Sequence, residues 1–232
     1  MERLSVLLAQ TMRVVQVRGI FGYLPEAVSA LVKEYGFVGY PREAELASLL
    51  VATDPNTAAK PAVFTQGKVT IDGRAIIIDR LEIYNNGILA NTRTDTTDSD
   101  LVVAHVLRWS GEYFKVTYDE IKPSAGHSSQ LEFRFARPLP ELLPTFAPVA
   151  NLISNSLEKD FWAFEPAYQV IGVSFYFDKN KYPAFAPNVV RIDYRAGQPF
   201  ERNIYWSDAP LSTANHEAVL TEFEKACLKA IK

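Results

Sequence analysis

Two turn signals in the middle of the chain constrain its fold more than any other feature. Asp72-Gly73 and Asn86-Gly87 are dipeptides typical of two-residue hairpin turns. The central residues of such turns adopt a positive φ, which glycine reaches freely and Asn or Asp at modest cost. Residues 74–84 lie between the turns and are apolar on both faces at first, then alternate apolar and polar. The sequence therefore predicts an antiparallel meander over about residues 69–94.

A cluster of Thr, Asp and Ser residues at 94–100 follows the meander. Oxygen-bearing side chains this close together suit a hard metal cation, but the spacing lacks the glycine and the distal Glu of a calcium loop. Thr97 as a helix N-cap, with Asp100 three residues later, explains the cluster without a metal, and acidic residues also complement the helix dipole. We therefore predict a helix start here, and no bound metal or cofactor.

Composition limits the compartment and the classes of partner. The 232 residues carry a net charge of −3. No large positive charge attracts phosphate backbones, which argues against a nucleic-acid partner. Cys227 is the single cysteine, which excludes an intrachain disulfide and fits a reducing compartment. The first residues lack a signal-peptide core or a membrane span, so we expect a cytoplasmic protein that does not contact membranes.

Helical periodicity marks the first part of the chain. Apolar residues at helical spacing predict a helix over residues 3–13, although the valines at 14, 15 and 17 favour a strand and leave its end open. Pro25 starts a second predicted helix, which Gly36 ends, and Pro41 starts a short third one. Residues 118–126 are predicted to form an exposed excursion.

The second half begins with a strand near 129–136, where apolar and polar residues alternate. Four prolines at 138, 140, 144 and 148 follow, for which a polyproline segment is one interpretation. The leucines among them favour short turns or 3₁₀ segments instead. A helix is then expected from about Pro148, with an apolar stripe formed by Val149, Leu152, Ile153 and Leu157.

A second meander, over about residues 168–207, precedes a last helix that begins at Ser212 or Thr213. Cys227 lies on the apolar stripe of that helix and is expected to be a buried, unreactive thiol. Both halves run strand, strand, strand, capped helix. Duplication explains this ββ(β)α pseudo-repeat, and so does the common packing of a helix on a meander. We predict an α+β fold of antiparallel meanders covered by amphipathic helices, as a single domain 1–232 or two halves, 1–125 and 126–232.

Three histidines are the weak catalytic candidates. His105 is expected on the charged face of the helix after the first meander, where it is solvated or acts as a general base. His216 is expected near the start of the last helix, where the dipole disfavours its charged form. His127 precedes Ser128, but neighbouring strand residues point to opposite faces, so this pair does not make a nucleophilic dyad.

Basic residues around the second meander are the weak ligand-binding candidates. Arg191, Arg195 and Arg202 suit an anion or nucleic-acid surface. Asp193 shares the strand face of the first two arginines, and cross-strand ion pairing explains them more simply.

No phosphate-binding glycine loop or nucleophile elbow is present in the sequence. The chain is therefore expected to be a noncatalytic interaction or structural subunit. Surplus apolar strand surface predicts that it associates with itself, as a homodimer or larger homo-oligomer, or with another protein. The alternative is a hydrolase whose site is assembled from dispersed carboxylates and histidines.

Overall fold

The structure is a computed structural model, and it describes residues 1–17, 25–46, 60–84, 86–115, 117–160, 168–178, 180 and 188–231. The fold is α+β, as predicted: antiparallel strands form an open sheet with helices packed on it. Hydrogen bonds join the strands in the order β2-β3-β4-β1-β5-β8-β7-β6. Contacts divide the chain into two compact units. The 8–129 unit also takes in Leu211–Thr213, and the 130–232 unit also takes in Met1–Leu7.

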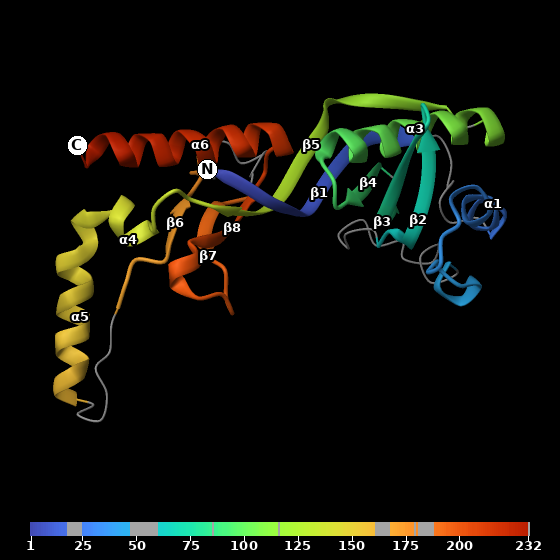
Figure 1. The fold of residues 1–232 in the computed structure, drawn as a ribbon. Helices are drawn as coiled ribbons and strands as arrows, with labels where there is room; N and C mark the ends of the chain where they lie inside the picture. The colour runs from blue at the N-terminus through green and yellow to red at the C-terminus, as the bar shows by residue number, and fades with distance from the viewer. Residues whose placement is uncertain are drawn as a thin grey trace. The chain divides into compact units, whose positions relative to one another are not determined.

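The 8–129 unit contains the predicted first meander. Its strands are β2 (Ala62–Ile71), β3 (Arg74–Tyr84) and β4 (Gly87–Thr92), and β4 pairs with residues 9–14 of β1 (Glu2–Val17). Helix α3 (Thr96–Phe114) packs on β2, β3 and β4, and α1 (Pro25–Tyr35) contacts β2 (Figure 1). The interior of this unit is apolar and includes the fully buried residues Phe64, Ile78, Leu81, Val102, Val103 and Val106.

The first predicted turn is confirmed and the second is shifted by one residue. Asp72 and Gly73 have φ of 49° and 80°, so both central residues are in the left-handed region. Tyr84 pairs with Gly87, which makes Gly87 the first residue of β4, with no positive φ. Asn85 lies outside the described residues. The reason for glycine at 87 is close approach, because a Cβ there would lie 2.9 Å from the Arg13 carbonyl oxygen.

The N-cap of helix α3 lies two residues before its predicted position. Asp95, rather than Thr97, is the N-cap, and its side chain accepts a hydrogen bond from the Asp98 amide at 3.0 Å. Asp98 is buried in the first turn and accepts a hydrogen bond from Arg74 at 2.8 Å. The cluster at 94–100 therefore serves as a helix start, as predicted, but through different residues.

The predicted helix over residues 3–13 is wrong, because this segment is part of strand β1. Ala9, Thr11 and Val15 are buried and are separated by even numbers of residues, which is the period of a strand. The pairing of β1 with β4 prevails over a helical spacing of leucines. Residues 118–126 are likewise not an excursion, since β5 runs from Tyr118 to Arg134.

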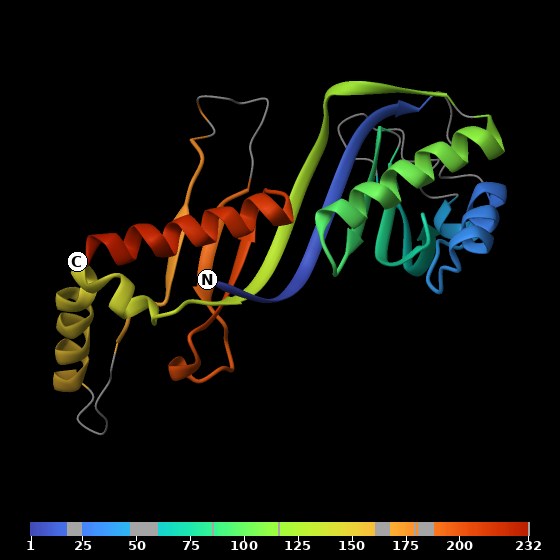
Figure 2. The same cartoon turned by 45° about the horizontal axis from the view of Figure 1, so that its top comes forward.

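The 130–232 unit contains the predicted second meander. Its strands are β6 (Gly172–Phe175), β7 (Val190–Tyr194) and β8 (Ile204–Ala209). Helix α6 (Thr213–Ala230) lies across these strands in both views (Figures 1 and 2). Phe133, Phe135, Ile192, Tyr205 and Leu220 form its core. Cys227 packs against that core, and burial raises the pKa of its thiol, which keeps it protonated and unreactive.

The proline-rich stretch forms short helical segments rather than a polyproline helix. These are α4 (Leu139–Leu142) and the 3₁₀ turn η2 (Pro144–Phe146), which leads directly into α5 (Ala147–Asp160). A second 3₁₀ turn, η3 (Phe200–Arg202), precedes β8. Within the part of the chain that the structure describes, no helix is long and apolar enough to cross a membrane.

Candidate functional site

His216 is buried in the 130–232 unit and is hydrogen-bonded to Ser207. The Nε2 of His216 lies 2.7 Å from the Ser207 hydroxyl, which itself donates to the Arg191 carbonyl oxygen at 2.6 Å. A serine hydroxyl has one proton, so Nε2–H of His216 must be the donor to Ser207. His216 therefore does not take a proton from Ser207, and both side chains are fully buried. The pair joins α6 to the sheet.

His105 lies on α3 beside Tyr35 of α1. The Tyr35 hydroxyl is 2.9 Å from Nδ1 of His105. Burial, followed by the charge of Glu34, raises the pKa of Tyr35, so its hydroxyl stays protonated and donates to Nδ1. Burial also lowers the pKa of His105, and the nearby Arg108 adds to this effect. His105 is thus a neutral acceptor that links two helices of the same unit.

His127 is paired with a carboxylate but with no nucleophile. Its Nε2 lies 3.0 Å from Asp100 Oδ2, and both side chains are partly exposed. Asp100, predicted as part of the helix cap, instead holds this histidine. The three histidines therefore have three separate partners: Tyr35, Asp100 and Ser207.

The three arginine candidates also have separate partners. Arg195 pairs with Glu132 at 3.2 Å, which is the cross-strand ion pairing expected from the sequence, although with a different acid from Asp193. Arg191 lies opposite Asp208, and its charge opposes the rise that burial causes in the pKa of that carboxyl. Arg202 contacts the Gln198 side chain at 3.5 Å. The structure does not assemble them around one point.

Helix α5 of the 130–232 unit is poorly covered by the rest of the chain that the structure describes. No side chain that the structure describes on this helix is buried. Figures 1 and 2 show α5 beside the segment that leads into β6, away from β7 and β8. The predicted stripe is present but faces outward: Val149 is 55% exposed and Leu152 66% exposed. Ile153 and the preceding Phe146 are also exposed.

The strand that ends the sheet adds further exposed apolar side chains to the same unit. Strand β6 is last in the strand order and pairs with β7. Phe175 is exposed on β6, and Ile171 and Tyr176 are exposed on either side of the strand. An open strand edge with exposed apolar residues is a surface that another chain can cover.

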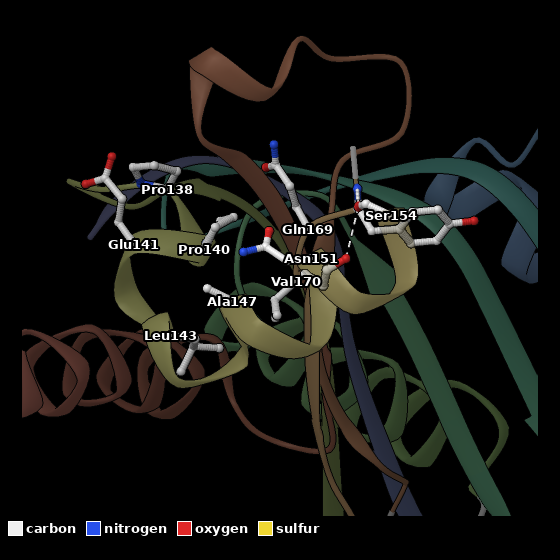
Figure 3. Close-up of a pocket in the computed structure, with 11 residues that line it drawn as sticks. Pro138, Pro140, Glu141, Leu143, Ala147, Asn151, Ser154, Gln169 and Val170 are labelled. Carbon is white, nitrogen blue, oxygen red and sulfur yellow. Dashed lines mark hydrogen bonds between the residues drawn. The ribbon is translucent and has the colours of Figure 1, made fainter. Parts of the chain in front are cut away.

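A pocket of about 600 Å³ lies between α5 and the residues before β6 (Figure 3). Ala147, Ala150, Asn151 and Ser154 line it from α5, which is a different helix face from the exposed apolar one. The opposite wall is formed by Tyr168, Gln169 and Val170. The remaining lining residues come from the proline-rich stretch: Pro138, Pro140, Glu141 and Leu143.

The sequence predicted the stripe on α5 but not that it would be uncovered. A signal was present, because residues 142–157 contain no charged residue, whereas charged residues make up 22% of the chain. A helix that is exposed on one side normally carries charge there. The pocket had no comparable signal, because its walls come from two segments, residues 138–154 and 168–170, that only the fold brings together.

No group of three or more His, Cys, Asp or Glu side chains suited to a metal ion occurs among the described residues. Searches against models of known protein families and against curated proteins found no match for this chain.

Proposed function

We propose that this protein is a noncatalytic interaction subunit that pairs with a second copy of itself through the exposed apolar face of α5. The observation that carries the proposal is a helix of 14 residues with an apolar stripe and no buried side chain among those described. Isolated helices of this length are marginal in water and depend on packing of their apolar face. A partner that covers the stripe supplies that packing.

The absence of charge on this face favours a second copy as the partner. In a twofold pair the same patch meets itself, so a charged patch would repel its own copy and an uncharged one does not. Residues 142–157 are uncharged. Helices that lie on membrane surfaces carry Lys or Arg on their polar face, and this stretch has neither.

The expected affinity is moderate. Fully burying a large apolar side chain contributes about 1.5–3 kcal/mol, and Phe146, Val149, Leu152 and Ile153 have roughly half of their surface left to bury. Two copies therefore gain on the order of 8 kcal/mol before the cost of association, which is itself about 4–15 kcal/mol. After the smallest of these costs the four side chains leave about 4 kcal/mol, which corresponds to a dissociation constant of about 1 mM. A micromolar dimer therefore requires that the exposed apolar residues at β6, Ile171, Phe175 and Tyr176, are buried in the pair as well.

The test is the mass of the full chain by light scattering between about 1 and 300 µM, a range that brackets a micromolar dissociation constant. The wild type should approach twice its monomer mass at the upper end, and Val149→Asp should remain a monomer. Asn151→Asp is the matched control, because it adds the same charge to the same helix on the pocket face, which lies opposite Val149 and Ile153.

A monomeric wild type over the whole range would refute the proposal. Equal loss of the dimer in Val149→Asp and Asn151→Asp would place the interface elsewhere. The hydrolase alternative is less well supported, because His105 and His127 contact no serine or cysteine, and the His216–Ser207 pair is fully buried with Nε2–H of His216 as the donor.

A further inference from the structure

The pocket beside α5 offers hydrogen-bonding groups that the fold leaves unused. Asn151 extends from α5 and Gln169 from the segment before β6 (Figure 3). Neither side-chain amide is hydrogen-bonded to another described residue. Each amide group carries both donors and an acceptor. Each amide can therefore accept a hydrogen bond from a peptide N–H and donate one to a peptide C=O.

The backbone at Gln169 can also form hydrogen bonds with an extended peptide. Gln169 and Val170 precede β6, whose ladder with β7 begins only at Gly172. Their backbone groups therefore lie outside the sheet's ladder, at its last strand. Strand-like segments at a sheet edge bind extended peptides through main-chain hydrogen bonds, while neighbouring pockets accept alternate side chains.

Ser154 holds the two walls together and is not itself free to bind. Its hydroxyl donates to the Ala150 carbonyl oxygen at 2.9 Å and accepts from the Tyr168 amide at 2.9 Å. This contact fixes the segment before β6 against α5. The small side chains of Ala147 and Ala150 leave the space between them open.

The charge of the pocket restricts what it can hold. Among the residues that the structure describes, Glu141 is the only charged one that lines the pocket, and no described Lys or Arg does. An anion such as phosphate would be repelled by Glu141 and would find no cationic partner. Pro140, Leu143 and Val170 supply an apolar surface for one aliphatic side chain.

We propose that this pocket binds an extended, uncharged or basic peptide segment of a partner protein. The peptide backbone bonds to the Asn151 and Gln169 amides, an aliphatic side chain contacts Leu143 and Val170, and a basic side chain lies near Glu141. This inference is independent of self-association, because the pocket and the exposed apolar stripe occupy different faces of α5.

The test is an NMR titration of the full, isotope-labelled chain with three blocked tetrapeptides, acetyl-Ala-Leu-Xaa-Ala-amide, in which Xaa is Lys, Gln or Glu. The Lys and Gln peptides should shift the amides of residues 150–154 and 168–170, with dissociation constants on the order of 0.1–1 mM. The Lys peptide should bind about two- to fivefold more tightly than the Gln peptide, the range expected for one exposed ion pair. The Glu peptide should bind most weakly, and inorganic phosphate should cause no shift.

Substitutions at Glu141 and Ala150 test whether the peptide binds in this pocket. Glu141→Gln should abolish the preference for Lys over Gln without preventing binding. Ala150→Phe should fill the pocket and abolish binding, whereas Leu152→Phe, on the exposed apolar face of α5, should not. If Ala150→Phe fails to fold, the double variant Asn151→Leu and Gln169→Leu removes both amides and should weaken binding at least tenfold, the loss of two hydrogen bonds.

Three outcomes would overturn the proposal. The first is that no peptide shifts an amide signal at a concentration ten times the expected dissociation constant. The second is equal affinity for the Lys and Glu peptides in the wild type. The third is a lower mass by light scattering for Ala150→Phe with unchanged peptide affinity, which would assign the pocket to a second copy of the chain.

Discussion

Helices α3 and α5 differ in how the chain uses a similar apolar stripe. Helix α3 spans Thr96–Phe114, is capped by Asp95, and buries Val102, Val103 and Val106 completely against its sheet. Helix α5 spans Ala147–Asp160 and leaves Val149 and Leu152 more than half exposed. Periodicity shows which residues of a helix share a face, but not whether the rest of the chain covers that face. The uncovered stripe is the one that is available to a partner.

The two helices should differ most in how much stability the protein loses when a leucine is replaced by alanine. Leu107→Ala on α3 should lower the free energy of unfolding by about 2–4 kcal/mol, because Leu107 is buried and its removal leaves a cavity. Leu152→Ala on α5 should change it by less than about 0.5 kcal/mol at concentrations where the protein is monomeric. Chemical denaturation at 1 µM and at 300 µM measures both.

The same pair of variants at high concentration sharpens the comparison. Leu152→Ala should become destabilising when the dimer is populated, because ligand binding and self-association stabilise the folded state by mass action. Leu107→Ala should cost the same at both concentrations. A large, concentration-independent cost for Leu152→Ala would mean that α5 is packed within its own chain.

The second prediction concerns the buried carboxylate at the start of α3. Asp98→Asn should lower stability by about 1–3 kcal/mol, because it breaks a pair between Arg74 and a fully buried side chain; the lower half of that range is expected since Arg74 is 53% exposed. Asp100→Asn is the control. It affects a half-exposed pair with His127 and should cost less than about 0.5 kcal/mol. Similar losses of unfolding free energy in the two variants, measured by denaturation, would contradict a structural role for the buried Asp98–Arg74 pair.

The sequence predicted the elements whose patterns are local, and missed those decided by pairing. The turn at Asp72-Gly73, helix α1 and the second meander followed from turn residues and periodicity. Strand β1 was missed because its leucines also fit a helix, and only its pairing with β4, 80 residues away, selects the strand. The cap at Asp95 was displaced because several Thr and Asp residues in a row all suit that role.

The candidate sites show the same limit. The ion pairing of Arg195 was predicted from residue type, but the solvated position expected for His105 was wrong, because it is hydrogen-bonded to Tyr35. No sequence pattern indicated the partners: Glu132 and Tyr35 lie 63 and 70 residues away from Arg195 and His105, and Ser207 lies on β8, before the turn that leads to His216 on α6. The pocket depends on the packing of two segments, α5 and residues 168–170. Neither segment carries a motif that announces a binding site.

The third prediction compares the starts of the two helices. Asp95→Ala removes the side chain that accepts the Asp98 amide and should cost about 1 kcal/mol of stability. Thr145→Ala, in the 3₁₀ turn that leads into α5, should cost nothing measurable, because that turn has no side-chain cap and Thr145 is exposed. Asp95→Ser should restore most of the loss, since serine also accepts a hydrogen bond at an N-cap. A failure of serine to do so would show that Asp95 acts mainly through Arg74, 4.0 Å away.

The smallest effect is a pH dependence that α3 should have and α5 should lack. Burial, and then the charge of Arg108, lowers the pKa of His105 below its ordinary value of 6.5, while Glu34 and Glu112 oppose the shift. Below pH 6.5 the unfolded state binds a proton at His105 more readily than the folded state does. The free energy of unfolding is therefore unaffected by His105 above pH 6.5 and falls as the pH drops below it. The Cε1 proton of His105 should therefore titrate by NMR with a midpoint below 6.5.

His105→Gln keeps an acceptor for the Tyr35 hydroxyl and should show a smaller fall in melting temperature between pH 7.5 and pH 5.5 than the wild type. Leu152→Ala changes no titratable group and should retain the wild-type slope. A midpoint at or above 6.5 would show that His105 is not held neutral against α1.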